Sequence, residues 1–143
     1  MDATQVFDKL LIAKALLFAG GALFAGVFAW LNLFYALRNV TPRMANVDIP
    51  GIPDLAKLQG QLRRGALIIL PIVIALFVGA GEYSSWDKWM TYFNRTPFGV
   101  RDQVFGLDIS FFVFEMPFYR ELQAYLFALF VITAIAVIAV HYL

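Results

Sequence analysis

Three long apolar runs constrain the fold of this chain more than any other feature. The first run, residues 10–37, is apolar apart from Lys14 and Asn32. As a helix it would be about 42 Å long, against about 30 Å of hydrocarbon in a bilayer. The other runs cover residues 65–81, the short limit for crossing, and residues 118–143. Because amides in lipid must be bonded internally, the runs predict three transmembrane helices.

The composition agrees with a lipid environment and narrows the chemistry. Hydrophobic residues make up 62% of the chain and charged residues 15%, and the net charge is +1. Clustered basic residues, the mark of nucleic-acid binding, are missing. Without cysteine and with a single histidine, His141, the chain offers no thiolate or multi-histidine metal site. We therefore expect no cofactor, no bound metal and no nucleic-acid partner.

The positions of the serines and of the single histidine do not favour a catalytic site. The serines are Ser84, Ser85 and Ser110, all at span borders or in a loop. If the third span is a straight helix, His141 lies across the membrane from them, so a hydrolase triad is not available. We expect that the chain is not an enzyme and has no catalytic residue.

Short polar segments separate the spans. In the connector 38–64, prolines at 42, 50 and 53 predict an extended stretch, and leucines spaced by three and four within 54–64 predict an amphipathic helix on the membrane surface. After the second span, Ser84 or Ser85 can cap a short interfacial helix that ends near Phe93, followed by a loop. The fold class is thus an all-α membrane protein, a single module over 1–143 with three transmembrane helices and short interfacial amphipathic helices.

Small residues, the side-chain amide of Asn32 and a proline indicate how the spans pack. Gly21, Ala25 and Ala29 recur four residues apart and clear a stripe for a neighbouring helix. Asn32 would hydrogen-bond across helices, with a substrate contact as the alternative. Pro71 is expected to bend the second span.

The third span is expected to begin near Pro117, with Glu121 in a first turn whose helix dipole favours a carboxylate. Glu82, Glu115 and Glu121 all lie near span borders. The simplest interpretation is that they mark where helices leave the lipid. A carboxylate pair that relays protons is the alternative.

Basic residues near the span ends give the orientation. The connector 38–64 holds Arg38, Arg43, Lys57, Arg63 and Arg64, whereas the longer segment 82–120 holds Lys88, Arg95, Arg101 and Arg120. The denser group predicts a cytoplasmic connector 38–64 and an extracytoplasmic aromatic loop, residues 82–117.

The stretch that begins at Pro97 carries a distinctive pattern. It reads F-G-V-R-D-Q-V-F-G-L-D-I-S-F-F-V-F-E-M-P-F-Y-R over residues 98–120, and His141-Tyr142 follow near the end of the third run. This pattern closely resembles the signature of a bacterial multi-pass membrane family, Uncharacterised Protein Family 0182. It departs from that signature at Gln103, Phe112 and Met116, where proline, tyrosine and leucine are usual.

The resemblance implies a longer protein of the bacterial inner membrane, with an additional leading helix, further spans and a large extracytoplasmic C-terminal region. The chain would be its N-terminal membrane portion. Its partners would be the lipid bilayer and helices from missing segments or other membrane subunits. No activity is carried over to any residue.

The aromatic loop is the candidate functional surface, and two interpretations stay open. It is either a self-folded plug that anchors the third span or a docking element for a partner. The docking residues would be Phe98, Gly99, Arg101, Asp102, Phe105, Gly106, Asp108, Phe111, Phe114, Glu115, Pro117, Phe118 and Arg120. A different function, a transport pathway lined by the second span and Asn32, is the alternative.

Overall fold

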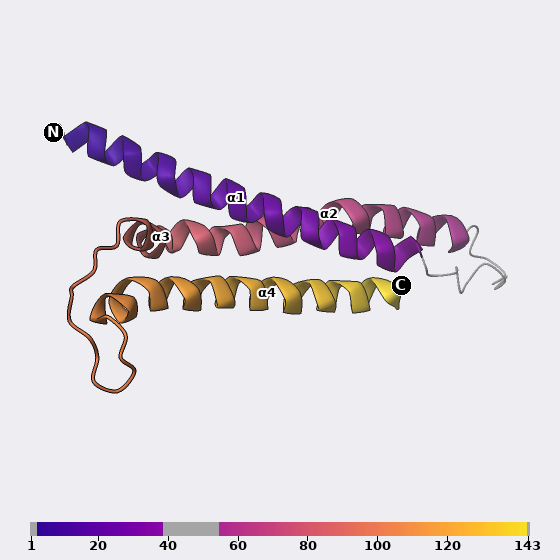
Figure 1. Cartoon of the computed structure of the whole chain (residues 1–143). Coiled ribbons are helices and arrows are strands. Elements are labelled where there is room, and N and C mark those ends of the chain that lie inside the picture. The colour runs from indigo at the N-terminus through magenta and orange to yellow at the C-terminus, as the bar shows by residue number, and fades with distance from the viewer. Residues whose placement is uncertain (1–2, 39–54, 143) are drawn as a thin grey trace.

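A computed structural model describes residues 3–38 and 55–142, which are helical except for one long loop (Figure 1). The helices are α1 (Ala3–Arg38), α2 (Leu55–Ser84), α3 (Trp86–Phe93), the π-helical turn η1 (Phe111–Glu115) and α4 (Met116–His141). The only extended pairing in the described ranges is an isolated antiparallel bridge between Arg101 and Asp108. The predicted all-α class is confirmed.

Three helical segments are long and apolar enough to cross a membrane. They are Phe7–Arg38, Lys57–Ser84 and Phe111–His141, with mean hydropathies of 2.1, 2.2 and 2.4. Large apolar side chains stay exposed along all three, so that Leu23, Phe77 and Phe127 are each 70% exposed or more. Exposure of this much apolar surface is unfavourable in water, whereas contact with lipid chains is compatible with it.

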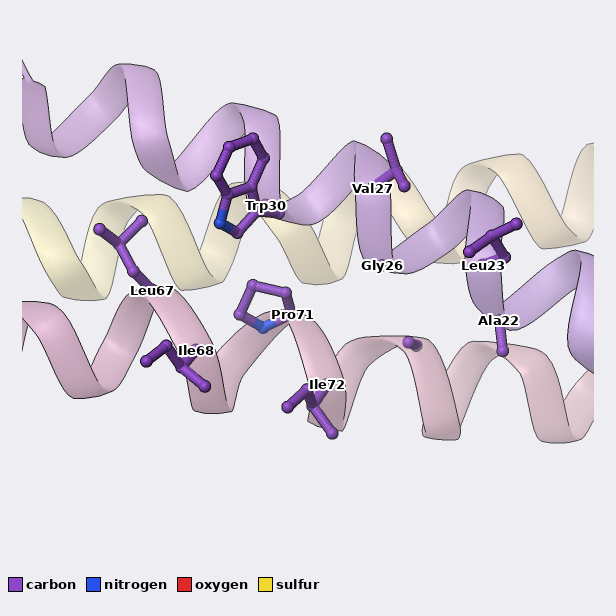
Figure 2. Close-up of a pocket in the computed structure, with 10 residues that line it drawn as sticks. Ala22, Leu23, Gly26, Val27, Trp30, Leu67, Ile68, Pro71 and Ile72 are labelled. Atoms are coloured by element: carbon purple, nitrogen blue, oxygen red, sulfur yellow. The ribbon is translucent and has the colours of Figure 1, made fainter.

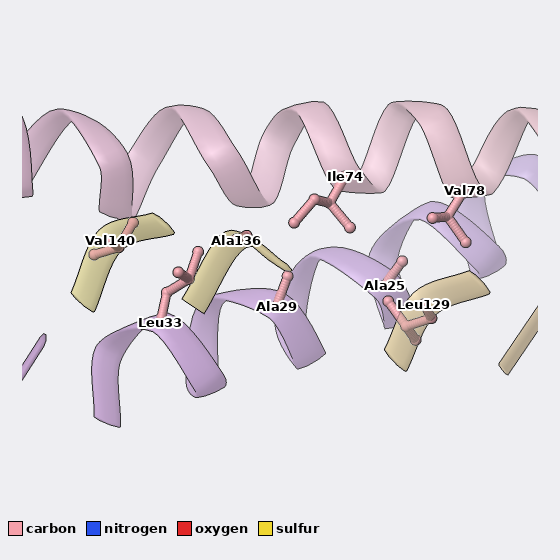
Figure 3. Close-up of a cluster of buried hydrophobic side chains, with 8 residues drawn as sticks. All are labelled: Ala25, Ala29, Leu33, Ile74, Val78, Leu129, Ala136 and Val140. Atoms are coloured by element: carbon pink, nitrogen blue, oxygen red, sulfur yellow. The ribbon is translucent and has the colours of Figure 1, made fainter. Parts of the chain in front are cut away.

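The spans form a bundle in which α1 and α4 run in one direction and α2 runs in the other (Figure 1). Figure 3 shows the core, to which all three helices contribute. Its members are mostly small or branched: Ala25, Ala29, Leu33, Ile74, Val78, Leu129, Ala136 and Val140. Small side chains let helix backbones approach closely, and this close packing stabilises helices in lipid, where the hydrophobic effect adds little.

Helices α1 and α2 approach each other closely at residues with small side chains. A Cβ placed on Gly79 would lie 2.7 Å from the Cβ of Ala22, and one on Gly26 would lie 3.2 Å from the Cβ of Ala75. One placed on Gly21 would lie 2.8 Å from Cγ of Glu82. On α1, Ala22 and Gly26 thus face the small residues Gly79 and Ala75 of α2, whereas Gly21 of the predicted stripe faces the side chain of Glu82.

Ala25 and Ala29 have no exposed surface, as expected of a packing stripe. Pro71 is buried in the middle of a continuous α2 and lines an apolar pocket of about 520 Å³ against Gly26 and Trp30 of α1 (Figure 2). Asn32 differs from the prediction. Its side chain is exposed and its Nδ2 donates to the carbonyl of Phe28, 2.8 Å away, on its own helix, rather than to another helix of the described ranges.

The separate surface helix predicted for 54–64 is wrong where the structure describes it. Residues from Leu55 onward belong to α2 and continue into the span without a break. The reason is local: nothing between Leu55 and Pro71 stops a helix, and the charged pair Arg63-Arg64 tolerates helical geometry. The predicted extended connector, residues 39–54, lies outside the described residues.

The start of the third span is also earlier than predicted. The chain is helical from Ile109, and the wide turn η1 precedes Pro117, with the Met116 N–H donating to the carbonyl of Phe111. A proline ring would collide with the carbonyl four residues earlier in a regular helix, and a widened turn gives it room. Glu121 consequently lies beyond the first turn of α4, so the predicted dipole contact is not its role.

We predict that Gly79→Ala lowers the free energy of unfolding in detergent by about 1–3 kcal/mol, because the new methyl group would overlap Ala22. The matched control is Gly81→Ala, where an added Cβ meets no atom within 4 Å. That variant should be neutral or slightly stabilised, since alanine is the better helix former. Thermal unfolding compares the two, and equal stability would contradict the close contact.

Candidate functional site

The loop between α3 and η1, residues 94–108, is held in shape from inside by two aspartates; we call it the signature loop. Asp108 accepts three backbone N–H groups: those of Phe98 (3.2 Å) and Ser110 (2.9 Å) at Oδ1 and that of Gly99 (2.9 Å) at Oδ2. It directly precedes the first helical residue, Ile109, so it also caps this helix. One carboxylate thus ties the start of the loop to its end.

Asp102 organises the tip of the loop in the same way. Its Oδ2 accepts the N–H groups of Val104 (3.1 Å) and Phe105 (2.9 Å), and its own N–H donates to the carbonyl of Leu107 (2.7 Å). Gly106, with φ of 67°, donates to the carbonyl of Asp102 (3.0 Å). Positive φ favours glycine, which explains this position in the signature.

The hydrogen bonds to Asp108 stabilise its charged form. Mainly because the backbone N–H of Ser110 donates to it, together with those of Gly99 and Phe98, the pKa of Asp108 lies below its ordinary value of 3.8. The folded loop therefore favours the ionised form of this carboxylate.

Two apolar side chains at the tip are largely exposed, although the ring of Phe105 lies 5.9 Å from that of Phe112. Val104 is 80% exposed and Phe105 is 70% exposed. Arg101 is exposed as well. Figure 1 shows the loop beside the start of α4, on the side away from α1. The described part of the bundle therefore leaves its tip uncovered. Val104 is absent from the predicted docking residues, because a lone valine gives no signal in a sequence.

Phe118, a predicted docking residue, is buried instead. Its ring lies between those of Trp89 (centroids 4.8 Å apart, edge to face) and Tyr92 (4.0 Å, stacked). It is 8% exposed and fastens α3 to α4. The prediction that it presents an apolar docking face is wrong, since the short helix α3 covers it.

The other aromatic and charged residues of the signature are divided between packing and surface. Phe114 packs on Phe98 (5.3 Å between centroids), and Phe111 lies near Tyr119 (6.5 Å). Glu115 forms an ion pair with Arg95 (3.4 Å), which is not one of the predicted docking residues. Of the remaining predicted docking residues, Pro117 is half-buried at the start of α4 and Arg120 is exposed.

A cluster of polar side chains lies where α2, α3 and α4 meet. Glu82, which is 4% exposed, accepts a hydrogen bond from Nε1 of Trp89 (2.9 Å). Glu121 accepts one from the hydroxyl of Ser85 (2.5 Å) and forms an ion pair with Lys88. Ser85 is the N-cap residue of α3, but its hydroxyl reaches α4 and does not cap the helix.

Of the three carboxylates predicted at span borders, two meet in this cluster and one does not. Glu82 and Glu121 lie near α3, and Glu115 pairs with Arg95 elsewhere. Their partners escaped sequence analysis, because Ser85 and Glu121 lie 36 positions apart and no local pattern joins them. Among the described residues, no three His, Cys, Asp or Glu side chains come together as a metal site requires.

We predict that the backbone amides of Gly99 and Ser110 keep their NMR shifts from pH 7 down to about pH 4. The folded-state pKa of Asp108 is lowered, so its stabilisation is complete above 3.8 and is lost as the pH falls through the lowered value. Asp108→Asn should abolish this acid transition, whereas Asp8→Asn, at an exposed carboxylate on α1, should leave it unchanged. A midpoint at or above 3.8 would argue against the three amide contacts.

Comparison with known proteins places these features in a family. The family model described as Uncharacterised protein family (UPF0182) matches residues 1–143. UPF0182 proteins of Salinispora arenicola, Thermobifida fusca and Corynebacterium efficiens are 35%, 36% and 33% identical to the chain, over 99%, 98% and 100% of it. The chain spans 14% of the length of each of these relatives.

No solved structure matches the chain. The match over the whole chain and the identities of 33–36% agree with the resemblance carried by the signature. The chain, with its three apolar helices and its aspartate-ordered loop, therefore belongs to the uncharacterised bacterial protein family UPF0182.

Proposed function

We propose that this chain is a non-catalytic membrane module of a larger bacterial envelope protein, and that its signature loop docks the extracytoplasmic part of that same protein. The observation that supports docking is the contrast between the two sides of the loop. Asp102 and Asp108 bind its backbone from inside, and Val104 and Phe105 face outward. An ordered loop with a bare apolar tip is typical of a binding surface.

The energetics favour this use of the loop. Burying one phenylalanine side chain contributes about 1.5–3 kcal/mol. Binding normally costs free energy to order a flexible segment, but the two aspartates already hold this one in place. Most of the gain from covering Val104 and Phe105 is therefore available for docking.

The proposed occupant follows from the length of the relatives. This chain covers 14% of each, so most of the protein in such relatives lies outside it. The charge bias around the spans predicts that the loop is extracytoplasmic, on the side where the resemblance implies a large C-terminal region. A surface on the same polypeptide is then present at high effective concentration.

A transport pathway has less support. The pathway would need polar or kinked elements along α2 and α1, yet Asn32 bonds to its own helix and Pro71 packs against α1. The non-catalytic assignment is supported by the residue types, since the chain has no cysteine and a single histidine, and by the ion pair that engages the carboxylate of Glu121, the partner of the Ser85 hydroxyl, with Lys88.

We predict that a photo-crosslinking phenylalanine analogue at position 105 of the full-length protein joins the extracytoplasmic C-terminal part of the same polypeptide. The matched control is the same analogue at Phe127, which is also 70% exposed but lies on α4 in the expected lipid belt. Mass spectrometry of the crosslinked peptides reads out both positions. Crosslinks from position 105 to lipid alone, or to a different protein alone, would contradict the proposed occupant.

A further inference from the structure

A second pocket, independent of the signature loop, lies between α1 and α4, with Glu82 of α2 and Trp89 of α3 in its wall. It has a volume of about 400 Å³ and is almost wholly apolar. Leucines of α1 and α4 form much of its wall, and Gly20 and Gly21 leave room on the α1 side. Its lining residues are Leu16, Leu17, Gly20, Gly21, Phe24, Glu82, Trp89, Leu122, Tyr125 and Leu126.

Among the described residues, no ion pair joins Glu82, the one carboxylate in this apolar lining, to a cation. The ammonium group of Lys14 lies over the rings of Tyr83 (5.2 Å) and Trp86 (5.3 Å) instead. Glu82 is nearly fully buried and is held by the indole N–H of Trp89, a neutral donor. The nearby ammonium group of Lys88 is paired with Glu121. The cluster thus contains two carboxylates and one lysine. A buried charge is costly without a counter-ion, so the wall beside Glu82 is complementary to a positive group.

Aromatic side chains complete this recognition chemistry. Phe24, Trp89 and Tyr125 line the same pocket, with the rings of Phe24 and Tyr125 6.3 Å apart. The hydroxyl of Tyr125 donates to the carbonyl of Gly21 (2.7 Å), which fixes its ring beside the carboxylate. Aromatic faces attract ammonium and quaternary ammonium groups, most strongly where water is excluded.

We propose that this pocket binds the ammonium headgroup of a membrane lipid, with Glu82 as the counter-ion and the lipid chain along the leucines of α1 and α4. The ligand is assigned to the bilayer rather than to solution because the lining beyond Glu82 is almost wholly apolar and comes mainly from α1 and α4, two helices long and apolar enough to cross a membrane. An alkyl chain matches this apolar lining, and a small soluble amine would leave it unfilled.

The test uses a photoactivatable dodecyl trimethylammonium probe on the full-length protein in dodecyl maltoside micelles. The probe should label peptides that contain Leu16–Phe24 or Leu122–Leu126, and a dodecanol probe with the same photoreactive chain should label them at least about tenfold less. Tetramethylammonium at equal concentration should not compete. Equal labelling by the two probes would overturn the ammonium assignment, and competition by tetramethylammonium would overturn the lipid assignment.

Three variants locate the site. Glu82→Gln should weaken binding of the ammonium probe about tenfold or more, because a charge-assisted contact is lost. Gly20→Leu fills the pocket without touching the carboxylate, since a Cβ there meets nothing within 4 Å, and it should also reduce labelling. Glu115→Gln removes the same charge outside the pocket and should change nothing.

Two results with these variants would overturn the proposal. One is labelling of both Glu82→Gln and Gly20→Leu at the level of the unmodified protein. The other is an equal loss of labelling in Glu115→Gln. If Glu82→Gln does not fold, the comparison of Gly20→Leu with Glu115→Gln decides, because neither substitution alters the buried carboxylate.

Discussion

The close packing of α1 against α2 is the interaction on which the rest of this structure depends. At Gly79 and Ala22 the two helices approach until an added methyl group would overlap its neighbour. This approach brings Gly21 against the side chain of Glu82, so the position of that carboxylate follows from the helix packing. The short helix α3 begins soon after Glu82, and its Trp89 bonds back to it. Helix packing thus determines where the polar cluster forms.

The packing of α3 then determines the geometry of the signature loop. Phe118 lies between Trp89 and Tyr92, which fastens the start of α4 to α3. The loop must close the gap between these two elements, and Asp108 closes it by binding amides at both ends. The residues of the family signature therefore differ in structural role. Phe118 packs α4 on α3, Asp108 maintains the shape of the loop, and Phe105 lies on the exposed tip.

Features that depend on local composition could be predicted from the sequence. Apolar runs longer than a bilayer is thick predicted the three spans, and the residues after Ser85 predicted α3. Features that depend on contacts between distant segments could not. Phe118 looked like a surface aromatic residue because its partners come from α3, and the hydroxyl of Ser85 looked like a cap because Glu121 is 36 positions away. Pro117 correctly predicted the start of α4, which begins at Met116, but no local signal predicted the helical turn η1 that precedes it and makes the third span begin earlier.

All of these features depend on the packing of α1 against α2 through small residues within a membrane. Cysteine crosslinking tests it directly, because the chain has no native cysteine. A Cβ at Gly26 would lie 3.2 Å from that of Ala75, close to the spacing in a disulfide. Oxidation of bacterial membranes that contain Gly26→Cys with Ala75→Cys should form this disulfide rapidly, and Gly20→Cys with Ala75→Cys should not. Absence of the first disulfide, or equal rates for the two pairs, would contradict the packing described above.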